Sequence, residues 1–104
     1  MTLYRAVFRW PVAAGDFQSD EAKGLRPRQL QLADPRLYTG ISMFSDLVQV
    51  HARRVQYPAF PPHTVEVMIP DGAPVEILKT LGRAHYTVIG TAEVLMGYVV
   101  RLVE

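Results

Sequence analysis

The first nine residues constrain the fold most, because they alternate as a β-strand does. The stretch Leu3–Phe8 reads LYRAVF, and as an extended segment it places apolar side chains on both of its faces. Arg5 therefore puts a permanent charge into a strand that otherwise looks buried. A buried guanidinium without a partner is costly, so the sequence predicts an anionic partner for it. That partner is either a carboxylate of the chain or a phosphate of a ligand.

Composition limits the chain to one small domain, residues 1–104. Hydrophobic residues make up 49% of the 104 positions, which is enough for a packed core. The 11 basic and 10 acidic residues nearly balance, so overall charge points to neither nucleic acid nor membrane as a partner. The chain has no cysteine, which excludes disulfides and thiolate metal sites. Neither a membrane span nor a signal peptide is expected from its apolar runs.

Hydrophobic periodicity predicts an α+β domain. A helix is expected over Leu47–Gln56, because Ser45-Asp46 offers an N-cap and Pro58 follows its end. The segment 12–36 is predicted to be a long loop, and the tail 92–104 favours a helix over a strand. Strands are predicted at Leu3–Trp10, Leu37–Phe44, His63–Ile69, Val75–Leu81 and His85–Ile89. About five strands and two or three helices would pack as two layers or as a small split β-sheet.

Several familiar sites are excluded by spacing. No glycine-rich phosphate loop is present, and His51, His63 and His85 are too scattered to predict a metal site. Ser42 has Gly40 two residues before it but Phe44 two residues after it, so it does not match the elbow of a serine hydrolase.

The residue types fit the cleavage of NAD better. Breaking the nicotinamide–ribose bond needs a cation for the phosphates, a hydroxyl, aromatic rings, and a carboxylate near the ribose. Arg5 in the first strand, Ser42 beside a glycine, and a tyrosine in a late strand occur in a suitable order. On spacing alone a structural role is favoured, in which Arg5 pairs with Glu66 or Glu93 and Ser42 bonds to a backbone carbonyl.

Five stretches that span the chain carry a family resemblance. They are TLYRAVF at Thr2–Phe8, GISMF at Gly40–Phe44, IPDG at Ile69–Gly72, HYTV at His85–Val88 and EVLMG at Glu93–Gly97. With them the chain resembles the NAD-dependent cytotoxins that bacterial type VI secretion systems export, a family of ADP-ribosyltransferase-like toxins. The first and last stretches are the most specific. Ile41 differs from related toxins, which can carry a second hydroxyl there.

The resemblance implies a function and site residues. The chain would be a bacterial toxin, either an ADP-ribosyltransferase or an NAD glycohydrolase, with NAD as substrate, no metal, and a protein as one option for the ADP-ribose acceptor. It would act in the cytoplasm of a target cell, or rest in that of the producing cell while a cognate antitoxin or immunity protein neutralises it. The implied catalytic residues are Arg5, Ser42 and Glu93. The implied NAD-binding residues are Arg5, Tyr38, Gly40, Ser42, His85 and Tyr86.

Two other classes stay open from the sequence. One is a degenerate toxin or binding domain that acts through a protein partner without catalysis. The other is a toxin that acts on RNA with His51, Arg53 and Arg54, although the charge balance makes nucleic acid an unfavoured partner. Loss of cellular NAD on expression would separate the first class from an enzyme.

Overall fold

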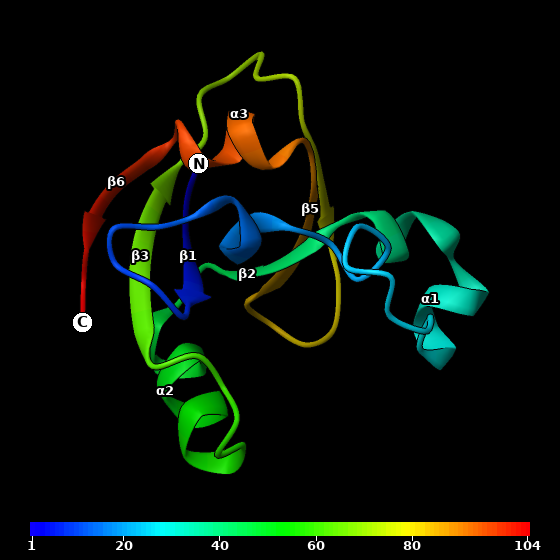
Figure 1. Cartoon of the computed structure of the whole chain (residues 1–104), viewed down its shortest axis with the longest axis horizontal. Helices are drawn as coiled ribbons and strands as arrows, with labels where there is room; N and C mark the ends of the chain where they lie inside the picture. The colour runs from blue at the N-terminus through cyan, green and yellow to red at the C-terminus, as the bar shows by residue number, and fades with distance from the viewer.

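The chain folds around one six-stranded antiparallel sheet, in the strand order β4-β5-β2-β1-β3-β6 (Figure 1). The computed structural model describes all residues, 1–104. Its strands are β1 (Thr2–Val7), β2 (Ile41–Phe44), β3 (His63–Met68), β4 (Glu76–Lys79), β5 (His85–Ile89) and β6 (Val99–Leu102). Its helices are α1 (Gln29–Ala33), α2 (Leu47–Gln56) and α3 (Ala92–Met96), with short 3₁₀ helices η1 (Ala14–Phe17) and η2 (Pro35–Thr39). None of the helices has the length and apolar character needed to cross a membrane.

The sheet is split at its centre. β1 pairs with β3 over six residues, from Thr2–Met68 to Val7–His63, whereas β1 pairs with β2 only between Tyr4 and Phe44. The sheet therefore consists of two three-stranded halves, β4-β5-β2 and β1-β3-β6, that meet at one residue pair. This confirms the predicted small split-sheet α+β domain.

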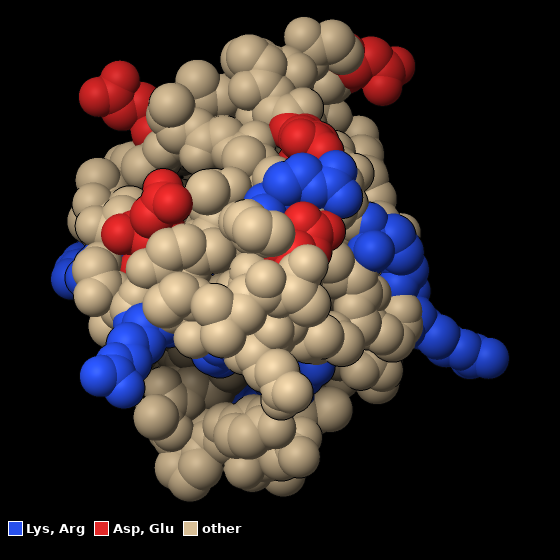
Figure 2. All heavy atoms as spheres, turned by 90° about the vertical axis from the view of Figure 1, so that its right-hand side faces the viewer, with Lys and Arg blue, Asp and Glu red and all other residues tan.

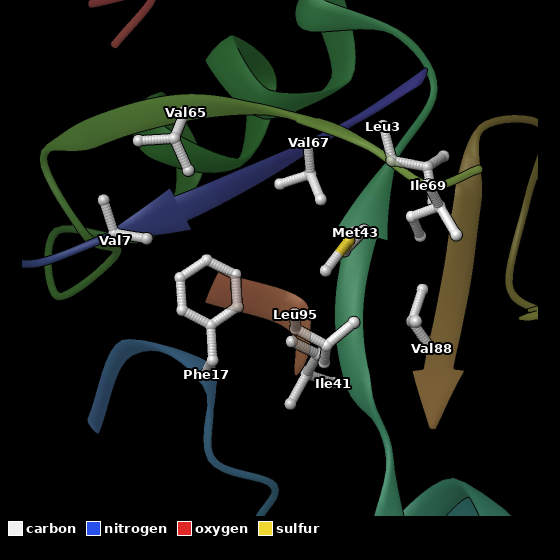
Figure 3. Close-up of a cluster of buried hydrophobic side chains, with 10 residues drawn as sticks. All are labelled: Leu3, Val7, Phe17, Ile41, Met43, Val65, Val67, Ile69, Val88 and Leu95. Carbon is white, nitrogen blue, oxygen red and sulfur yellow. The ribbon is translucent and has the colours of Figure 1, made fainter. Parts of the chain in front are cut away.

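One face of the sheet carries the hydrophobic core. Side chains from the central strands, among them Leu3, Met43 and Val88, are fully buried there. Phe17 from η1 and Leu95 from α3 approach this face from outside the sheet and close it (Figure 3). Because side chains alternate along a strand, Ser42 and Thr87 point to the opposite face. Helix α2 packs against β1 and β2.

Helix α2 has the predicted limits. Its buried residue is Val50, whereas Val48 and Val55 are 66% and 87% exposed. The helix begins after Asp46, whose carboxylate accepts a hydrogen bond from the Val48 amide at 2.9 Å. The cap was thus readable from the sequence, whereas the rotation of the helix depended on tertiary packing.

Three segments differ from the predicted secondary structure. Residues 37–39 belong to the 3₁₀ helix η2, because the Asp34 carboxylate caps Pro35 and the turn that follows it. The expected long loop contains α1 and η1. The tail holds a short helix, α3, which ends at Gly97, and then strand β6, which pairs with β3 and adds a sixth strand to the expected five. Thr64 on β3 is buried, and its hydroxyl bonds to Arg54 and Glu104.

Candidate functional site: a basic cavity at the split of the sheet

Arg5 connects the two halves of the sheet where their main chains separate. Its Nη1 donates to the carbonyl of Ser42 on β2 at 2.8 Å, and its Nε donates to the carbonyl of Asp16 in η1 at 3.1 Å. Neither Glu66 nor Glu93 is its partner, since Glu66 is bound by Arg101. A guanidinium has five N–H donors, so these two bonds leave three for a ligand.

The segment around Asp16 holds Arg5 in place. The buried Asp16 carboxylate accepts from the amides of Phe8 at 2.9 Å and Ala13 at 3.0 Å, which fixes η1 against the end of β1. Burial lowers the pKa of Arg5 to about 10, although the nearby charges of Asp16 and Asp20 oppose this fall. The side chain therefore stays charged at neutral pH.

Arg5 lines a cavity of about 400 Å³ that opens at the split. Its cationic residues are Arg5, Lys23, Arg28 and Arg53, while Asp20 is its one carboxylate. Figure 2 shows a hollow in this side of the molecule, with lysine or arginine atoms visible inside it. The cavity is far more basic than the chain as a whole, whose net charge is +1. Such a concentration of guanidinium groups favours phosphate or another anion.

His85 brings a neutral imidazole to the cavity. Its Nδ1 lies 2.6 Å from Thr80 Oγ1, which in turn lies 3.1 Å from Thr87 Oγ1. Its ring packs edge-on against Phe44, with 5.2 Å between ring centroids. Burial, together with the charges of Arg53, Lys79 and Arg28, lowers the pKa of His85 to about 4. No protein hydrogen bond uses Nε2, so this atom is available to a ligand.

Gly40 and Ser42 form the wall next to Arg5. A Cβ at position 40 would overlap the methyl group of Thr87 and lie 3.1 Å from the Val88 carbonyl oxygen, so only glycine fits against β5 there. Ser42 accepts from Arg5 with its carbonyl, while its hydroxyl makes no hydrogen bond within the protein. The expected hydroxyl beside a glycine is therefore present and faces the cavity.

Asp20 lies opposite these strands in the segment before α1. Its Oδ2 accepts from Arg28 Nη2 at 3.1 Å and from Gln31 Nε2 at 2.9 Å. Partial burial raises its pKa, but these hydrogen bonds and the charge of Arg28 outweigh that effect and lower it overall. Asp20 is therefore ionised at neutral pH.

Of the residues implied by the resemblance, Arg5, Gly40, Ser42 and His85 meet at the cavity, whereas the other three lie outside its lining. Tyr86 follows His85 in β5 and so points to the opposite face, where it packs against the hydrophobic core. Tyr38 donates its hydroxyl to the Leu25 carbonyl. Glu93 is exposed on α3, which packs against η1 on the core side of the sheet. The geometry therefore does not bring Glu93 to Arg5.

The three residues expected for RNA do not form a free basic face. Glu104 binds both His51, with 2.6 Å between Nε2 and Oε2, and Arg54, with 2.8 Å between Nη1 and Oε1. Arg53 points away from this cluster, lines the cavity, and lies over the Phe44 ring at 5.8 Å. No group of three or more histidine, aspartate or glutamate side chains lies close enough to hold a metal ion.

Sequence reasoning missed Asp20, Arg28 and Thr80, and it assigned Arg53 to a different surface. Arg28 and Asp20 lie in the segment taken as a loop, and no periodicity marks them as part of a site. Thr80 could have been suggested by its spacing, since it follows β4 directly and so lies beside the start of β5.

The comparisons with known proteins do not add a family to this geometry: no family model, curated protein or solved structure matches the chain.

Proposed function

We propose that this protein binds NAD in the basic cavity and breaks the bond between nicotinamide and ribose. The observation that carries the proposal is Arg5, held at the split of the sheet with three free N–H donors and lining the same cavity as Ser42 and His85. A volume of about 400 Å³ lies within the range of ligand pockets. A planar guanidinium group can bond two oxygens of a phosphate at once, whereas a lysine acts as a point charge. The arginines of the cavity therefore suit the diphosphate of NAD.

The chemistry needs a carboxylate at the ribose, and Asp20 is the one that lines the cavity. As the C–N bond breaks, its electron pair leaves with nicotinamide, and the ribose becomes positively charged. An ionised carboxylate stabilises that charge. Water or an acceptor group then bonds to the ribose carbon and loses a proton, which gives ADP-ribose or an ADP-ribosylated product. In this proposal Asp20 takes the role that the resemblance implied for Glu93.

The biological role proposed with this chemistry is that of a bacterial toxin with a cognate immunity protein. The support for this part is the sequence resemblance alone, from TLYRAVF at the first strand to EVLMG in the tail. Loss of NAD would account for toxicity in the cytoplasm without any nucleic-acid contact. An immunity protein that covers the mouth of the cavity would suffice for protection.

The test is nicotinamide release by the purified protein, together with NAD levels in bacteria that express it. Arg53→Gln is the informative variant, because Arg53 pairs with no carboxylate and its replacement should leave the fold intact. Removing one charged contact to a phosphate should weaken NAD binding about 10- to 100-fold. Arg101→Gln is the matched control, since Arg101 pairs with the Glu66 carboxylate near the other edge of the sheet.

The proposal requires nicotinamide release by the wild type and by Arg101→Gln, with a marked loss in Arg53→Gln. A folded wild-type protein that neither binds NAD nor lowers cellular NAD would refute it. Toxicity with unchanged NAD would favour the non-enzymatic partner-binding class, and salt-dependent RNA cleavage would favour the RNA-acting class.

A further inference from the structure

A second cavity, also of about 400 Å³, adjoins the basic cavity. Five residues line both of them: Arg5, Arg28, Ser42, Arg53 and His85. The two spaces are therefore lobes of one groove, and three arginines stand at the boundary between them. Asp20 and Lys23 line only the first lobe.

The second lobe differs from the first in its chemistry. The first lobe has a carboxylate and side-chain amides, whereas aromatic rings line the second. We name it the aromatic lobe, after Phe44, Tyr57 and Phe60, which line it beside Pro61. Tyr57 ends α2, and the Phe60 amide donates to the Tyr57 carbonyl at 3.0 Å, so a tight turn brings the two rings to one side of the chain. Arg54 lies 5.9 Å from the Phe60 ring centroid and occupies one face of it. Tyr57 is 47% exposed, and its hydroxyl has no protein partner, so its ring is open to a ligand.

We propose that the aromatic lobe binds the adenine ring of the dinucleotide, with the diphosphate at the three shared arginines and the nicotinamide ribose beside Asp20. This inference rests on the proposed function and assigns each end of the substrate to a lobe. The direction follows from the single carboxylate: the bond that breaks must lie near Asp20, so the other ring lies on the far side of the arginines. Two joined lobes of this size suit a dinucleotide, whereas a mononucleotide would fill one of them.

Tyr57 is then the residue on which the base stacks. Stacking of a base on an aromatic side chain contributes about 1–3 kcal/mol by alanine substitution, which corresponds to about a 5- to 150-fold change in affinity. Phe44 itself is covered by Arg53 and by the edge of the His85 ring, so it holds those two groups toward the boundary rather than stacking on a base.

The experiment compares two ligands by calorimetry on the full chain. Carba-NAD carries both rings and resists hydrolysis, whereas nicotinamide mononucleotide lacks the adenosine half. The wild type should bind carba-NAD at least 10-fold more tightly than nicotinamide mononucleotide. Tyr57→Ala should weaken carba-NAD about 10-fold and leave nicotinamide mononucleotide unchanged. Phe8→Ala is the matched control, because Phe8 is 57% exposed and lines neither lobe.

Three results would overturn the inference, and they differ from one another. Equal wild-type affinity for the two ligands would mean that the aromatic lobe holds no ring. An equal loss for both ligands in Tyr57→Ala would place nicotinamide, not adenine, in that lobe. Either result leaves NAD binding itself intact. If the folded wild type binds neither ligand, the proposed function fails, and the assignment of the lobes fails with it.

Discussion

Replacing Arg5 with alanine should weaken the fold moderately, because two opposing contributions nearly cancel. The variant loses two hydrogen bonds from a charged donor, to the carbonyls of Asp16 and Ser42. Hydrogen bonds of this kind contribute about 1.5–3 kcal/mol each, so their loss removes about 3–6 kcal/mol. Alanine also removes the cost of burying the charge. That cost follows from the fall of the Arg5 pKa from 12.5 to about 10, and at about 1.4 kcal/mol per pKa unit it is about 3 kcal/mol.

The difference is a loss of about 0–3 kcal/mol in the free energy of unfolding, centred on about 1.5 kcal/mol, which corresponds to a fall of about 6–12 °C in Tm for a domain of this size. Urea unfolding followed by circular dichroism measures the first quantity. Arg101→Ala is the control: its exposed pair with Glu66 should contribute less than about 1 kcal/mol. Arg5→Lys keeps the charge but loses the planar fork, so it should lie between the wild type and Arg5→Ala.

Two results would refute this reasoning. An Arg5→Ala variant more stable than the wild type would mean that the two carbonyl bonds contribute less to stability than the burial of the charge costs. A variant that fails to fold would mean that Arg5 is chiefly structural, and its effect on NAD could not then be assigned to binding. The intermediate result leaves a folded protein, in which loss of NAD affinity reports on the three free donors.

Three further predictions follow from the cavity wall. Gly40→Ala should lower the free energy of unfolding by about 1–3 kcal/mol in a urea titration, because its Cβ would overlap Thr87. Unchanged stability would show that β5 can move to make room for the Cβ. The His85 pKa is lower in the folded state, so the unfolded chain binds a proton at a higher pH than the folded protein does. The free energy of unfolding should therefore fall as pH drops from about 6.5 to about 4. Unfolding measured across this pH range should show that His85→Asn lacks this part of the fall. Asp20→Asn should lower kcat for nicotinamide release at least 10-fold, while its affinity for carba-NAD changes little. Glu93→Gln should match the wild type in both quantities. The reverse pattern would assign the carboxylate role to Glu93.

The sequence predicted elements whose causes are local. The helix Leu47–Gln56 and the strand His85–Ile89 have the predicted bounds, because a cap marks the start of the first and Gly82-Arg83 separates the second from the strand before it. The helix predicted for the tail is present over Ala92–Met96 but was wrong beyond it, since pairing with the neighbouring strand β3 makes residues 99–102 extended. Arg5 was recognised as a charge that needs partners, but those partners are main-chain carbonyls, which no side-chain pattern reveals.

The candidate site was predictable only in part, for a similar reason. Arg5, Ser42 and His85 lie on the adjacent strands β1, β2 and β5, and Gly40 directly precedes β2. Arg28 and Arg53 reach the cavity from separate helical segments, so their positions depend on how those segments pack. Strand alternation alone already separates His85 from Tyr86, and this rule would have excluded one of them from a shared site.

A crystal structure of the protein with bound ADP-ribose tests the central claim most directly. The account predicts that the diphosphate lies within hydrogen-bond distance of the free Arg5 donors and of Arg53, with the terminal ribose beside Asp20. A ligand bound elsewhere, or a diphosphate that Arg5 does not contact while it holds the carbonyls of Asp16 and Ser42, would contradict it.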